Sequence, residues 1–127
     1  MINQDDLEAF GYYNIPPTTD NSDATFLEDY CKFVEGMVLT YGRDRLAENT
    51  LGLVGEAGEV AEKVKKFFRD GTLDEAAIQL ELGDVTFYLA ALHNVLGLDF
   101  SETIQRNKDK LIKRKMNNTL RGSGDNR

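Results

Sequence analysis

Apolar residues recur at steps of three and four along most of this sequence, which is the spacing of one face of an α-helix. Four segments carry the pattern, at 25–41, 44–69, 72–97 and 101–115. The pair Asp70-Gly71 supplies a helix stop between the two longest. No segment shows the alternation of a half-buried strand, and the connections are short. The pattern therefore predicts an all-α, four-helix bundle-like fold.

The two ends of the chain differ from this helical region. Both prolines, Pro16 and Pro17, stand in a stretch rich in Gly, Tyr, Thr and Asp. We expect an irregular arm at 1–20, a helical domain at 21–116 and a flexible, polar tail at 117–127. A bundle with two long central helices often covers its remaining apolar stripe by self-association, so we expect a homo-oligomer.

Composition narrows the function classes. The chain has 127 residues, with 22 acidic and 15 basic side chains and a net charge of −7. This acidity argues against a nucleic-acid-binding protein, which needs a basic face. No apolar run reaches the length of a transmembrane helix, and the N-terminus is acidic. With its single cysteine, Cys31, the chain is expected to be cytoplasmic and not bound to a membrane.

Four acids carry the candidate chemistry. Glu56 and Glu59 are three residues apart in the second predicted helix, and Glu81 and Asp84 are three apart in the third, so each pair shares one helix face. Glu56 and Asp84 lie equally far from residue 70 on either side, and so do Glu59 and Glu81. An antiparallel hairpin that turns at residue 70 therefore brings all four carboxylates together. Because clustered carboxylates are costly without a counter-charge, this arrangement favours a hard divalent cation, Mg²⁺ or Mn²⁺. The alternative is a solvated surface, since acids at this spacing are common.

Three runs of the sequence resemble the MazG-like all-α nucleoside triphosphate pyrophosphohydrolases over about residues 25–115. They are LGLVGEAGEVAEKVKKFF, ELGDVTFYLAAL and NKDKLIKR. The resemblance implies a Mg²⁺-dependent hydrolysis of an NTP or dNTP to the monophosphate and pyrophosphate, in dimers or dimers of dimers. It implies that the metal ligands are Glu56, Glu59, Glu81 and Asp84, with phosphate contacts from Asn107 and Lys110. Many relatives carry a further Glu where this chain has Gly55, which leaves the general base open between Glu56 and Glu59.

Basic residues supply candidates for the phosphates. Residues 106–115 contain six bases and one acid, and part of this helix can close the site around a triphosphate. Lys63 and Lys66, beyond Glu59, are further candidates. The alternative for the basic helix is a solvated face, and the alternative for Lys63 and Lys66 is ion pairing one turn away, with Glu59 and Glu62. The chain has no GxxxxGK[ST] loop, so metal and side chains would have to organise the phosphates.

The hypothesis that follows is in-line attack of water at the α-phosphorus, with Glu56 or Glu59 accepting the proton. One alternative belongs to another class, a non-catalytic, metal-stabilised helical interaction module. A second is a relative acting on deoxyuridine nucleotides or phosphoribosyl-ATP.

Among the remaining candidates, we expect the aromatics of the first helix to lie in the core and His93 to be a structural helix residue. Asn94 is a weaker candidate for reading a base edge. The core aromatics are Phe26, Tyr30 and Phe33, and the candidates for a mobile lid are Tyr12 and Tyr13.

Overall fold

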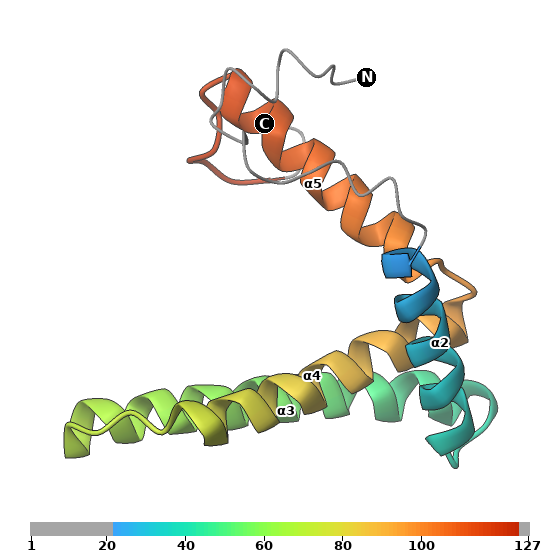
Figure 1. Ribbon diagram of the computed structural model, residues 1–127, viewed down its shortest axis with the longest axis horizontal. Helices are drawn as coiled ribbons and strands as arrows, with labels where there is room; N and C mark the ends of the chain where they lie inside the picture. Colours follow the sequence, from blue (N-terminus) through green and yellow to red (C-terminus); the bar gives the residue numbers. More distant parts are fainter. Residues whose placement is uncertain (1–21, 125–127) are drawn as a thin grey trace. The chain divides into compact units, whose positions relative to one another are not determined.

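The computed structural model describes residues 22–124, and this part of the chain forms four α-helices and no β-strand (Figure 1). The helices are α2 (Ser22–Met37), α3 (Gly42–Asp70), α4 (Glu75–Leu96) and α5 (Phe100–Met116). The all-α fold predicted from the periodicity is confirmed. The predicted arm at 1–20, with Tyr12 and Tyr13, lies outside the described residues. No helix within residues 22–124 has the length and apolar character needed to cross a membrane.

The ends of α3 and α4 are set by local backbone chemistry. α3 ends where Gly71 adopts a φ of 76° and its N–H donates to the Phe67 carbonyl at 2.8 Å. α4 begins after Asp74, whose carboxylate accepts the N–H of Ala77 at 2.9 Å. The apolar spacing predicts that Asp74 lies inside the third helix, and this prediction is wrong. Asp74 is instead the N-cap, because its side chain satisfies an N–H that has no partner within the helix.

The first predicted helix was expected to continue to Tyr41, whereas α2 ends at Met37. Tyr41 has an extended backbone, with φ −132° and ψ 158°, and Gly42 follows with a φ of 63°. A positive φ is readily adopted by glycine, so Gly42 lets the chain change direction into α3. The helical spacing of apolar residues continued past this turn and gave no sign of it.

Helices α3 and α4 form an antiparallel hairpin and lie side by side (Figure 1). The ring of Tyr88 in α4 lies close against Gly52 of α3, where an added Cβ atom would be 2.3 Å from Cε1 of Tyr88. Only a residue without a side chain leaves room for the Tyr88 ring at this position. Gly52 and Tyr88 are equally far from residue 70, so this contact confirms the register predicted for the hairpin.

A small core joins α2 to α4. Val34 of α2 and Ala90 and Ala91 of α4 are buried, with further apolar side chains packed around them. Asn94 of α4 donates from Nδ2 to the Cys31 carbonyl of α2 at 2.8 Å. This bond gives Asn94 a structural role, in contrast to the base contact considered from the sequence.

The predictions for the aromatic and histidine side chains had different outcomes. Tyr30 packs against the core, but Phe26 and Phe33 are 71% and 58% exposed, so placing them in the core was wrong. Helical spacing identifies an apolar face but not whether another element covers it.

His93 is buried, its Nδ1 lies 2.7 Å from the Leu89 carbonyl, and its ring stacks on Phe100. The structural interpretation of His93 is confirmed.

By their contacts, the described residues divide into two compact units, one of residues 28–100 and one of residues 22–27 with 101–124. In the second unit, Ile112 and Arg114 of α5 are buried. Arg114 Nη2 donates to the Gly124 carbonyl at 3.2 Å, and the Thr119 N–H donates to the Arg114 carbonyl at 2.8 Å. Residues 117–124 thus turn back onto α5. The single helical domain at 21–116 and the flexible tail stay predictions.

Candidate functional site

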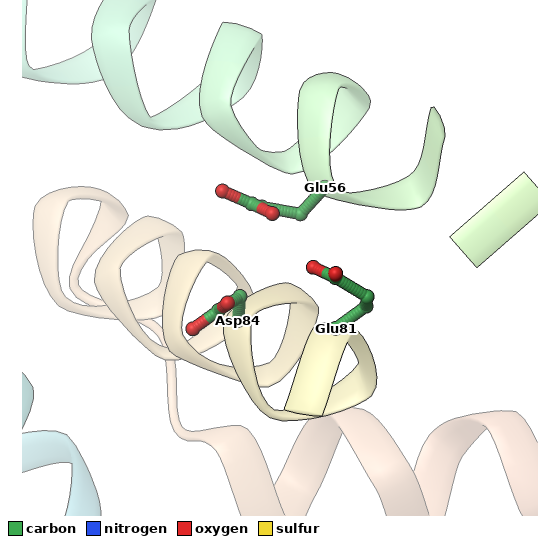
Figure 2. A group of neighbouring side chains, drawn as sticks. All are labelled: Glu56, Glu81 and Asp84. Carbon is green, nitrogen blue, oxygen red and sulfur yellow. The ribbon is translucent and has the colours of Figure 1, made fainter. Parts of the chain in front are cut away.

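Three carboxylates meet between α3 and α4. Glu56 comes from α3, and Glu81 and Asp84 come from successive turns of α4 (Figure 2). Each can offer one oxygen such that the three oxygens lie within 4.8 Å of one another. The register fixed at Gly52 explains this, because Glu56 lies one turn further along the same face of α3 and so also faces α4. Three of the four predicted ligands are therefore brought together.

The electrostatics of this group reflect its crowded negative charge. Burial raises the pKa of Glu56 above its ordinary 4.5, and the neighbouring Asp84, Glu81 and Glu59 raise it further. Glu56 and Glu81 are half-buried, and Asp84 is exposed, which leaves the group open to solvent on one side. Carboxylate oxygens are the preferred ligands of hard divalent cations. The residues present thus fit Mg²⁺ or Mn²⁺, which would offset the repulsion.

Glu59, the fourth predicted ligand, is exposed and is not one of the three converging carboxylates. A different side chain of α3 contacts Glu81. The Nζ of Lys63 lies 3.1 Å from Oε1 of Glu81, and the Lys63 pKa is raised by this hydrogen bond and by the charge of the carboxylate. The role of Glu59 as a metal ligand stays a prediction.

The other predicted phosphate contacts are placed as follows. Lys66 is exposed on α3. Asn107 and Lys110 are exposed on α5, three residues apart and therefore on one helix face. Since α5 beyond Phe100 belongs to the other compact unit, their roles toward a phosphate stay predictions. Arg106, in the same basic run, forms a local ion pair, with its Nη2 2.5 Å from Oε1 of Glu102.

Two features of the α3–α4 hairpin do not follow from the sequence. The first is the pairing of Lys63 with Glu81, because the sequence offered Glu59 as the local partner of Lys63. The second is Asn49, which is 3% exposed and whose Nδ2 has no hydrogen-bond partner among the described residues. It shares the α3 face of Gly52 and Glu56. The sequence indicates Asn49 only as a polar residue on the face of α3 that packs against α4.

The raised pKa of Glu56 predicts how stability depends on pH without metal. The pKa of Glu56 is higher in the folded protein than in the unfolded chain, so at a pH between these two values the folded protein binds more protons. The contribution of Glu56 protonation to the free energy of unfolding therefore declines as pH rises from below 4.5 through the folded pKa. We expect Glu56→Gln to reduce this decline. Melting temperatures of both proteins in EDTA, compared at each pH, measure it. A difference that does not vary with pH would contradict the prediction.

Comparison with known proteins agrees with this geometry. Residues 45–119 match the family model described as the MazG nucleotide pyrophosphohydrolase domain. The chain is also 51% identical over 83 residues to the Gene 37 protein of Mycobacterium phage L5, an alignment that covers 61% of this chain and 73% of the relative. No solved structure matches. The matched family domain takes in α4, α5 and most of α3, and with it all three converging carboxylates, so the chain belongs to the MazG nucleotide pyrophosphohydrolase family.

Proposed function

We propose that this protein is a Mg²⁺-dependent nucleoside triphosphate pyrophosphohydrolase, which converts an NTP or dNTP to the monophosphate and pyrophosphate. The observation that carries the proposal is the convergence of Glu56, Glu81 and Asp84 from two helices of a MazG family domain. Membership of the family supports hydrolysis of a nucleotide at a pyrophosphate bond. The acidic group supports dependence on a divalent cation.

The chain's own residues take distinct roles in this proposal. Glu56, Glu81 and Asp84 hold the cation, and a bound Mg²⁺ or Mn²⁺ would polarise the α-phosphoryl group and lower the pKa of water. Glu59 lies one turn from Glu56 and outside the converging group, so its carboxylate is the one left to accept the proton of the attacking water. This favours Glu59 over Glu56 as the general base.

The triphosphate needs positive or donor groups on the side away from the cation. In this proposal these groups are Lys63 and Lys66 of α3, while the phosphate contacts of Asn107 and Lys110 stay what the resemblance implies. We also propose a cytoplasmic location, in keeping with the lone Cys31 thiol.

A substrate panel tests the proposal. Purified protein is incubated with Mg²⁺ and each NTP, each dNTP, dUTP and phosphoribosyl-ATP, and both products are measured. We expect the monophosphate and pyrophosphate in equal amounts from at least one nucleoside triphosphate, and none in EDTA. Release of orthophosphate would place attack at the γ-phosphorus and contradict the proposal. No release from any compound would favour the non-catalytic helical module, and activity confined to phosphoribosyl-ATP would favour that relative.

We further propose that the protein is a homodimer or homotetramer. The α3–α4 hairpin leaves large apolar side chains exposed on both helices, among them Leu51 at 71%, Val54 at 66%, Phe68 at 81% and Leu80 at 73%. Two helices alone cannot enclose a core, whereas two copies of the hairpin can bury these side chains against each other. We expect light scattering after size exclusion to give two or four times the 14.3 kDa chain mass. A monomer mass at micromolar concentration would contradict this.

A further inference from the structure

The contact between Lys63 and Glu81 differs from the other ion pairs in the C-terminal part of α3, from Glu62 onward. It joins α3 to α4, with the side chains only 27% and 17% exposed. The other ion pairs of α3 from Glu62 onward are local and more exposed, such as Lys65 with Glu62 at 69% and 37%. Glu81 is also one of the three converging carboxylates. One carboxylate therefore belongs to a partly buried ion pair and to the candidate metal site.

This sharing has an energetic consequence. Lys63 supplies one positive charge beside three carboxylates, which leaves the repulsion between them only partly offset. A divalent cation placed among the same oxygens would be attracted by the carboxylates and repelled by the Lys63 ammonium. Lys63 and the cation thus compete for Glu81, and each makes the other's binding less favourable.

We propose that Lys63 acts as the counter-ion of the carboxylates in the metal-free site, and that a divalent cation replaces Lys63 as the partner of Glu81 when it binds. The inference rests on the proposed function only in taking Glu56, Glu81 and Asp84 as the ligands. In the metal-free protein, Lys63 holds Glu81 and lowers the repulsion between the helices. When the cation binds, the Nζ of Lys63 is released beside the site, where a phosphate oxygen can accept its hydrogen bond.

The test measures metal binding without nucleotide. Mg²⁺ and Mn²⁺ affinities of the wild type and Lys63→Met are determined by calorimetry, and melting temperatures are recorded in EDTA. We expect Lys63→Met to bind the cation roughly three- to tenfold more tightly, since a repelling charge is gone. We also expect its metal-free form to melt at a lower temperature. Lys63→Arg retains the charge and is expected to keep the wild-type affinity within about twofold.

Lys65→Met is the matched control. It removes the same charge from the same turn of α3 but breaks the exposed pair with Glu62, leaving Glu81 untouched. Its metal affinity is expected to stay within about twofold of the wild type, because its charge is exposed and screened by solvent. Side-chain NMR of ¹⁵N-labelled lysine adds a direct readout. The Lys63 Nζ signal, identified by its loss in Lys63→Arg, is expected to shift on Mg²⁺ addition, and that of Lys65 is not.

Several results would overturn the inference. Equal affinities of Lys63→Met and Lys65→Met would show that Lys63 does not compete with the cation. Weaker binding by Lys63→Met would show that Lys63 positions Glu81 for the metal instead. Failure of every variant to bind a divalent cation would overturn the inference together with the metal site. If Lys63→Met tightens metal binding while no nucleotide is hydrolysed, the inference stands and the proposed function fails.

Discussion

Asp84→Asn is expected to reduce nucleotide hydrolysis by at least about 100-fold while leaving the helical circular dichroism unchanged. Asp84 contributes one of the three converging carboxylates, and its replacement by a neutral amide removes an anionic ligand of nearly the same shape. The fold is expected to survive because Asp84 is exposed. In EDTA the melting temperature should rise, since Asp84 is one of the charges that raise the pKa of Glu56. Steady-state rates, metal titration and thermal melting measure the three effects.

The control for this variant is Asp70→Asn. It makes the same chemical change at the end of α3, where Asp70 pairs with the adjacent Arg69 and takes no part in the carboxylate group. Its turnover should equal that of the wild type. Full activity of Asp84→Asn would remove Asp84 from the site, and a lower melting temperature in EDTA would contradict the repulsion between the carboxylates.

Gly52→Ala is expected to destabilise the protein and to weaken metal binding. The new Cβ would lie 2.3–2.7 Å from three ring carbons of Tyr88, so the ring or the helices must move. Overpacking of this kind costs about 1–3 kcal/mol, from which the gain of about 1 kcal/mol for alanine over glycine in a helix is subtracted. Since Glu56 lies one turn further along this face, separating α3 from α4 also separates it from Glu81 and Asp84. Chemical denaturation and metal titration check both consequences.

Two further variants isolate the contact. Gly58→Ala lies in the same helix with nothing within 4 Å of its new Cβ, so it is expected to stabilise the protein by about 0.5–1 kcal/mol. In a Tyr88→Leu background, Gly52→Ala is expected to cost less than in the wild type, because the ring that it meets is gone. If Gly52→Ala were as stabilising as Gly58→Ala, α3 and α4 would not approach each other as described.

The hairpin register was predictable because it depends on quantities that a sequence contains. A helical repeat and a stop at Asp70-Gly71 are enough to place Glu56 opposite Asp84. The partner of Lys63 was not predictable, since Glu59 and Glu81 both lie within reach of its long side chain and the choice depends on how closely the two helices pack. Phe26 and Phe33 were misplaced for a related reason. Their spacing is helical, but their burial depends on whether another surface covers them.

The close contact of Gly52 with Tyr88 also bears on the connection between the two helices. Because this contact holds the same register in the middle of the hairpin, we expect the carboxylates to stay aligned when the chain is cut in the turn from Gly71 to Asp74. This turn is therefore the preferred position for new chain termini. A circular permutant with its new termini between Thr72 and Leu73 should keep Glu56, Glu81 and Asp84 at their present spacing.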